Sequence, residues 1–162
     1  ILARTSKEVP GVIDWALQHL DIDKQEIGIG GISMGGDISV AAAGLDRRIV
    51  LAIPWVATPD WLRPGTSESV GEPDAEAQAC YDELNPLTHL ERYAHCPRIV
   101  FQNGADDRQV PPDGSLRFKE ALRRDLYRNC PERIDAVLHP GVAHQVDDAM
   151  WKNTEQLLQT YL

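Results

Sequence analysis

The sequence lacks the features that a membrane protein or a nucleic-acid-binding protein needs. Its longest apolar run, residues 49–57, has nine residues and is interrupted by Pro54, whereas a helix that crosses a bilayer needs roughly 20. No charged region followed by an apolar stretch marks a signal peptide. Positive charge is scarce, with 16 Lys and Arg against 25 Asp and Glu and a net charge of −9. Nucleic acid and anionic membranes repel such a chain. We therefore expect neither as a partner, and we expect a cytoplasmic protein.

Cysteine is also scarce. The three cysteines, Cys80, Cys96 and Cys130, are odd in number, widely spaced, and form no C-x-x-C pair. This pattern argues against a zinc site and against a disulfide framework. We expect scattered thiols in a reducing compartment, with no metal and no cofactor.

The 162 residues contain 43% hydrophobic residues, enough for one domain with a buried core. Apolar runs of strand length alternate with segments of helical period, which predicts an α/β domain over residues 1–162 with a mostly parallel sheet flanked by helices. The expected strands are 26–32, 48–53, 98–102 and 133–139. The expected helices are 5–20, opened by a Thr5–Glu8 capping box, 34–45, 75–84, 86–93, 115–128 and 147–161.

The strongest chemical signal is Gly31-Ile-Ser33-Met34-Gly35, followed by Gly36, between an expected strand and an expected helix. In such a strand–turn–helix the serine sits on a sharp turn with its hydroxyl projecting, and we expect the flanking glycines to be needed because a Cβ there would clash. The N–H of Met34 then lies at a helix N-terminus, where it can stabilise an oxyanion. The motif predicts a nucleophilic serine.

A phosphate-binding interpretation of the same glycines is weaker. Gly28-x-Gly30-x-x-Ser33 lacks the third glycine of the dinucleotide fingerprint, and no acidic residue ends the second expected strand. The sequence also contains no Gly-Lys-Ser or Gly-Lys-Thr. We therefore expect no nucleotide cofactor.

A serine nucleophile needs a base, and the base needs an orienting carboxylate. The turn after strand 98–102 contains Asp106 and Asp107, and the turn after strand 133–139 contains His144. His139 is a weaker candidate for the base, because it ends the strand itself and would pack or contact substrate. The order serine, acid, histidine is the order of α/β-hydrolases.

Three ordered motifs carry a resemblance to the α/β-hydrolase superfamily, and within it to the dienelactone hydrolase and prolyl-oligopeptidase-like esterase branch. They are Asp23-x-x-x-Ile27-x-Ile29-x-Gly31-x-Ser33-x-Gly35-Gly36, Gly104-x-x-Asp107-x-x-Val110-Pro111 and Pro140-Gly-x-x-His144. The resemblance covers essentially the whole chain. It implies that Asp107 is the acid, in register with Val110-Pro111, and leaves Asp106 as a turn residue.

The same resemblance implies that part of the family's sheet is missing, because the nucleophile follows the first strand here and the fifth strand in the family. Together with a first residue that is Ile1, this resembles the carboxyl-terminal part of a larger hydrolase. The loop that gives the second oxyanion N–H is then absent, and strand 26–32 has a bare edge. We expect the chain to self-associate across a two-fold axis at residues 26–32, or to need an upstream segment.

An insertion over about 55–90, rich in proline and polar residues, is expected to act as a lid or to line a pocket. Trp55 and Trp61 either line an acyl pocket above Ser33 or are core aromatics under a long loop. The expected function is cleavage of a small carboxylic ester by Ser33, Asp107 and His144. A peptidase or acyltransferase of the same fold, and an inactive fragment or interaction module, are the alternatives.

Overall fold

The computed structural model describes residues 1–69 and 71–162, so that position 70, inside the expected insertion, lies outside the described residues. The described strands are β1 (Ile27–Ile32), β2 (Ile49–Trp55), β3 (Arg98–Gly104) and β4 (Ile134–His139). They form one sheet in the order β1-β2-β3-β4, and each neighbouring pair is parallel. The parallel α/β architecture expected from the sequence is confirmed.

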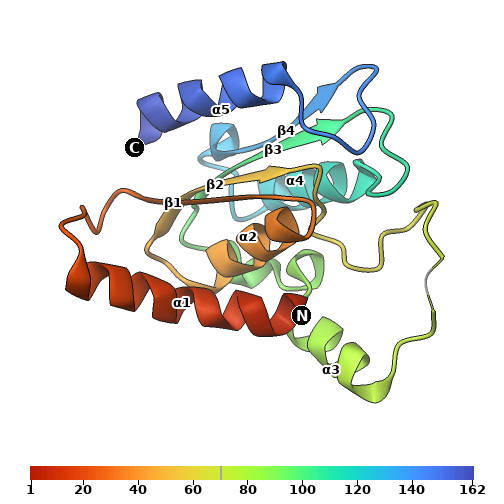
Figure 1. Cartoon of the computed structure of the whole chain (residues 1–162), viewed down its shortest axis with the longest axis horizontal. Coiled ribbons are helices and arrows are strands. Elements are labelled where there is room, and N and C mark those ends of the chain that lie inside the picture. The colour runs from red at the N-terminus through yellow and green to blue at the C-terminus, as the bar shows by residue number, and fades with distance from the viewer. Residues whose placement is uncertain (70) are drawn as a thin grey trace.

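Helices cover both faces of the sheet (Figure 1). Helix α5 (Asp148–Tyr161) lies on one face, and α1 (Leu2–His19), α2 (Met34–Leu45) and α4 (Asp113–Arg124) lie on the other. The segment between β2 and β3 contains α3 (Ala75–Leu84) and two 3₁₀ turns, η1 (Pro86–Thr88) and η2 (Leu90–Tyr93), in place of the single helix expected over 86–93. A third turn, η3 (Pro131–Arg133), precedes β4.

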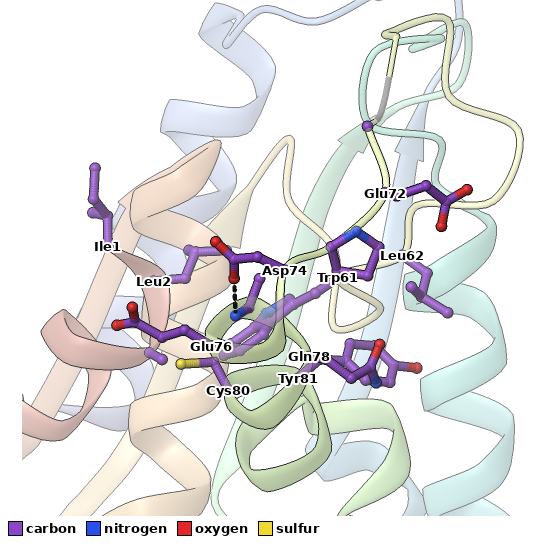
Figure 2. Close-up of a pocket in the computed structure, with 14 residues that line it drawn as sticks. Ile1, Leu2, Trp61, Leu62, Glu72, Asp74, Glu76, Gln78, Cys80 and Tyr81 are labelled. Carbon is purple, nitrogen blue, oxygen red and sulfur yellow. Dashed lines mark hydrogen bonds between the residues drawn. The ribbon is translucent and has the colours of Figure 1, made fainter.

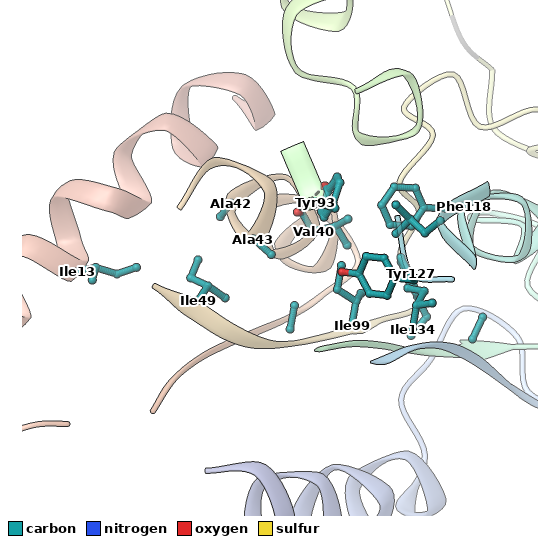
Figure 3. Close-up of a cluster of buried hydrophobic side chains, with 14 residues drawn as sticks. Ile13, Val40, Ala42, Ala43, Ile49, Tyr93, Ile99, Phe118, Tyr127 and Ile134 are labelled. Atoms are coloured by element: carbon teal, nitrogen blue, oxygen red, sulfur yellow. Dashed lines mark hydrogen bonds between the residues drawn. The ribbon is translucent and has the colours of Figure 1, made fainter. Parts of the chain in front are cut away.

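The main core lies between the sheet and helices α2 and α4 (Figure 3). Phe118 of α4 packs edge-on against Tyr93 and Phe101, with ring centroids 5.0 and 6.2 Å away. The buried hydroxyl of Tyr93 donates to the carbonyl of Val40, 2.9 Å away, so its polar end is satisfied. A second apolar cluster under α5 is formed by Leu51, Ile53, Trp55, Val56, Val142 and Met150.

Helix α1 begins earlier than the sequence indicated. The expected Thr5–Glu8 capping box is wrong, because the helix begins at Leu2 and Glu8 instead pairs with Arg4 at 2.9 Å. Pro10 therefore lies inside the helix, beyond its first turn. A proline there removes one helical hydrogen bond. Burial of Ala3, Ser6 and Ile13 on the α2 side offsets this loss, since most helical stability in proteins comes from packing.

Strand β1 is at an edge of the described sheet, with β2 as its neighbour on one side. Across residues 1–69 and 71–162, no strand pairs with its other side. The bare edge expected from the sequence is therefore present in the part of the chain that the structure describes.

Arg48 connects α1 to the loop that leads into β2 through hydrogen bonds to residues of both segments. Its guanidinium binds both carboxylate oxygens of Asp46, the carboxylate of Asp14 and, at 3.1 Å, the carbonyl of Pro10. Asp46 also caps the turn by accepting from the N–H of Arg48 at 3.0 Å. These hydrogen bonds to Arg48 hold the pKa of Asp46 below its ordinary value of 3.8, although burial opposes them.

Replacement of Asp46 by asparagine should lower the free energy of unfolding by about 1 kcal/mol at pH 7. Because the folded-state pKa of Asp46 is lowered, its stabilisation is present above the unfolded value near 3.8 and is lost as the pH falls through the folded value. The difference between wild type and Asp46→Asn should therefore shrink between pH 7 and pH 3 in urea unfolding. Asp21→Asn, at an exposed position, is the control. An equal difference at both pH values would contradict this account.

Candidate active site

Ser33 joins β1 to α2 on a backbone of unusual geometry. Its φ is 54° and its ψ is −119°, a left-handed conformation that is uncommon for a residue other than glycine. The turn is held by hydrogen bonds on both sides: the N–H of Ser33 donates to the carbonyl of Trp55 at 2.9 Å, and its own carbonyl accepts from Gly36 and Asp37. The serine is therefore fixed at the carboxyl edge of the sheet.

The space around the turn explains two of its three glycines. A Cβ on Gly31 would lie 2.3 Å from the backbone of Gly35, and a Cβ on Gly36 would lie 2.4 Å from the Cβ of Ala57. A Cβ on Gly35 would have nothing within 4 Å. Our expectation that the glycines on both sides of the serine prevent a clash is correct for Gly31 and Gly36 and wrong for Gly35, because the side of α2 at that position is open.

The structure brings Ser33, His144 and Asp107 together, from the ends of three strands. The Nε2 atom of His144 lies 2.9 Å from the Oγ atom of Ser33. Its Nδ1 atom lies 2.7 Å from Oδ2 of Asp107, whose side chain is fully buried. An ionised carboxylate only accepts hydrogen bonds, so Nδ1–H donates to Asp107. Nε2 is then left without a proton and accepts from the hydroxyl of Ser33.

The loop after β3 (the acid loop) holds Asp107 close to the loop after β4, which carries His144 (the histidine loop), and it leaves Asp106 at the surface. The Oδ1 atom of Asp107 accepts from the N–H groups of Gln109 and Val110, at 2.9 and 2.8 Å, which leaves Oδ2 for the histidine. Asp106 is exposed, and its N–H donates to the carbonyl of Val142 at 2.9 Å. Gly104 lets the acid and histidine loops meet, because a Cβ there would lie 2.3 Å from the carbonyl oxygens of both Val142 and Ala143.

His139, the weaker candidate for the base, is engaged elsewhere. Its Nε2 atom lies 2.8 Å from Oε1 of the buried Gln102, and its side chain is 12% exposed. His139 therefore packs against Gln102 of the neighbouring strand β3, and the histidine that binds Ser33 is His144.

Sequence reasoning missed a buried ion pair next to this site. Asp37, in the first turn of α2, is fully buried and accepts from Arg63 at 2.7 Å and from the N–H of Thr58 at 2.8 Å. Burial raises the pKa of Asp37, while Thr58 and Arg63 act in the opposite direction. The pair ties the segment after β2 to the helix that begins at Ser33. The available signal was an aspartate four residues after the serine, in an otherwise apolar helix.

The two tryptophans of the expected pocket lie in different cavities. Trp61 lines a cavity of about 740 Å³ between the start of α1 and α3, where Figure 2 shows it near Leu2, Tyr81 and Cys80. Trp55 packs against Trp151 of α5, with ring centroids 5.0 Å apart, and lines a cavity of about 240 Å³. Among the described residues, neither lining includes Ser33, Asp107 or His144. The structure thus does not gather Trp55 and Trp61 into one pocket above Ser33.

The sequence matches the model of the prolyl oligopeptidase family over residues 3–161. The chain belongs to this family of serine hydrolases. Among curated proteins, none has significant similarity to the sequence.

Solved structures with similar folds cover nearly the whole chain. A puromycin-hydrolyzing peptidase of Mycobacterium tuberculosis has a TM-score of 0.75 and 20% identity over 97% of this chain and 24% of its own. An acylaminoacyl peptidase of Pyrococcus horikoshii has a TM-score of 0.73 and 19% identity over 100% and 29%. A putative dienelactone hydrolase of Klebsiella pneumoniae has a TM-score of 0.63 and 19% identity over 95% and 58%. This chain therefore spans between about a quarter and three fifths of these relatives.

Two further features of the described residues bear on binding. None of the helices in residues 1–69 and 71–162 combines the length and the apolar composition needed to cross a bilayer. In the same residues, no three His, Cys, Asp or Glu side chains are grouped as ligands of a metal ion would be.

The contrast between Gly31 and Gly35 gives a direct test of the turn. Gly31→Ala should lower the free energy of unfolding by about 2 kcal/mol or more, because its Cβ meets backbone atoms that cannot rotate away. Gly35→Ala should change it by no more than about 1 kcal/mol, in the stabilising direction, since alanine favours helix. Denaturant unfolding of the two variants measures both values. Equal losses would mean that the space around Gly31 is not what fixes the turn.

Proposed function

We propose that this protein hydrolyses carboxylic esters through an acyl-enzyme, with Ser33 as nucleophile, His144 as base and Asp107 as orienting acid. The observation that carries the proposal is the unbroken hydrogen-bond chain from Ser33 Oγ through the imidazole to the buried carboxylate. Membership of the prolyl oligopeptidase family supports serine hydrolase chemistry.

The geometry supports a two-stage reaction. In the first stage, Nε2 of His144 takes the proton of Ser33 as Oγ attacks the ester carbonyl, and the imidazolium then gives that proton to the leaving alcohol. In the second, His144 activates water in the same way to release the acid. Asp107 holds the imidazole in the required tautomer and stabilises its positive form. The loop N–H groups that bind Oδ1 keep the carboxylate in place.

The oxyanion of each tetrahedral intermediate needs hydrogen-bond donors. Met34 is the first residue of α2, so its N–H lies at the positive end of the helix dipole, next to the nucleophile. We propose this N–H as one oxyanion donor. Loss of one such donor typically costs about 10²–10³ in rate.

A peptide or acyl-aminoacyl substrate is the second candidate. The family name and the names of two structural relatives, a puromycin-hydrolyzing peptidase and an acylaminoacyl peptidase, favour amide cleavage. A matched pair of chromogenic substrates with the same acyl group, one a p-nitrophenyl ester and one a p-nitroanilide, separates the two proposals. If kcat/KM for the ester exceeds that for the anilide by more than the ratio of their uncatalysed hydrolysis rates, the esterase proposal is supported. Comparable kcat/KM values for the two substrates support the peptidase proposal.

Ser33→Ala should abolish hydrolysis and leave the fold intact, because alanine fits the turn as well as serine does. We expect kcat/KM on a p-nitrophenyl ester to fall at least about 10³-fold, and labelling by a fluorophosphonate probe to disappear. Ser67→Ala, at an exposed serine, is the control and should keep both. Unchanged turnover in Ser33→Ala would exclude Ser33 as the nucleophile. Absence of labelling in the wild type would favour an inactive interaction module.

Asp107→Asn and Asp106→Asn should differ sharply although the positions are adjacent. An amide at position 107 can hold the imidazole in the wrong tautomer, so kcat should fall on the order of 10³–10⁴-fold. Asp106 is exposed, and the carboxylate bound to Nδ1 of His144 is that of Asp107, so the Asp106 variant should stay within about twofold of the wild type. Steady-state kinetics of the two purified variants measures this. A larger loss at Asp106 would reverse the assignment.

A further inference from the structure

Two cysteines that are far apart in the sequence lie at one end of the sheet. Cys96 precedes β3, and Cys130 precedes η3 and β4. Because β3 and β4 are parallel neighbours, the segments that lead into them meet at the amino ends of the strands, opposite the edge that carries Ser33. Both thiols are free and partly exposed, and both side chains pack against the main core.

Hydrogen bonds between the two segments bring these cysteines together. Arg133 donates through its main-chain N–H to the carbonyl of Cys130 at 3.0 Å and through its guanidinium to the carbonyl of Cys96 at 2.9 Å. The hydroxyl of Tyr127 donates to the carbonyl of Pro97, next to Cys96, at 2.7 Å. The carbonyl of Tyr127 accepts from the N–H of Cys130 at 3.0 Å. Each segment is thus anchored to the other on both sides of the thiols.

The side chain of Cys96 lies against the segment that contains Cys130. The Sγ atom of Cys96 lies 3.6 Å from the carbonyl oxygen of Leu126, in the segment that ends at Cys130. Burial and the neighbouring thiol of Cys130 together raise the pKa of the Cys96 thiol. Cys96 also has a φ of 53°, which glycine would adopt at lower cost. The backbone therefore gives no reason for a cysteine at this turn.

We propose that Cys96 and Cys130 form a reversible disulfide when the protein meets a low-molecular-weight disulfide oxidant. One cysteine, as thiolate, attacks a sulfur of the oxidant and releases one small thiolate, leaving a mixed disulfide on the protein. The other cysteine, as thiolate, attacks the protein sulfur, closes the Cys96–Cys130 bond and releases the second small thiolate. The two cysteine protons end on the two released thiols, and two electrons pass from the cysteine pair to the oxidant.

The bond would join the segments that lead into β3 and β4 and would enclose α4 between them. These strands lead at their far ends to Asp107 and His144, but the bond lies at the opposite edge of the sheet. It therefore constrains unfolding and leaves the geometry at Ser33 unchanged. A closed loop of this length should raise Tm by about 10 °C, with no change in reaction rate.

The test uses the whole chain treated with oxidised glutathione and compared with the reduced protein. Non-reducing peptide mapping should find a Cys96–Cys130 cross-link with the loss of two hydrogens and without a retained glutathione. The rise in Tm should be reversed by dithiothreitol. A map with glutathione retained on either cysteine, or with a bond to Cys80, would overturn the proposal. A cross-link without a rise in Tm would overturn its stabilising role.

Two variants complete the design. Cys130→Ser should lose the Tm increase and form no intramolecular bond with Cys96, because no second thiolate is left to close it. Cys80→Ser should behave as the wild type, since Cys80 lies on α3, at the cavity of Figure 2. If Cys130→Ser does not fold, the peptide map of Cys80→Ser still decides whether Cys96 and Cys130 join. A Tm increase retained in Cys130→Ser would contradict the proposal.

Discussion

The candidate site depends on close contacts between main-chain segments at glycine residues. At these positions a side chain of any size would not fit. At Gly31 the strand meets the start of α2, and at Gly36 the helix meets the segment that leaves β2. At Gly104 the acid loop meets the histidine loop. The short distances from His144 to Ser33 and Asp107 follow from these contacts, because Ser33 lies between Gly31 and Gly36 and the histidine loop packs directly on Gly104, three residues before Asp107.

Two buried carboxylates, Asp37 and Asp107, lie at the carboxyl edge of the sheet, and they differ in the groups that they bind. Asp37 is compensated by Arg63 and by a main-chain N–H, so its charge serves to hold the segment after β2. Asp107 has main-chain donors on one oxygen and the imidazole on the other. Only Asp107 is thus directed at His144. Arg63 keeps the second charge from being left unpaired in the interior, where an isolated carboxylate is costly.

The fold places two groups of candidate functional side chains at opposite ends of its parallel strands. Loops at the carboxyl ends carry Ser33, Asp107 and His144, in keeping with the position of sites in open α/β sheets. Loops at the amino ends carry Cys96 and Cys130, which share contacts through Arg133 and Tyr127. A sheet of rigid strands keeps the two ends apart, so a covalent change at one end can alter stability without moving the groups at the other.

The sequence by itself determined what depends on neighbours in the chain. It indicated the parallel α/β class, the turn at Ser33, and His144 in place of His139 as the base, whereas the choice of Asp107 over Asp106 came from the family resemblance. Strand ends and tight turns are set within a few residues, and the carboxyl ends of parallel strands must share an edge.

Only the tertiary structure decided features that depend on segments far apart in the chain. It placed Trp55 and Trp61 in different cavities and continued α1 through Pro10. It also left open space beside Gly35, where a Cβ would fit, and paired Asp37 with Arg63. It also placed Cys96 beside Cys130. No local pattern encodes these outcomes, because each is set by which surfaces pack together once the strands have aligned.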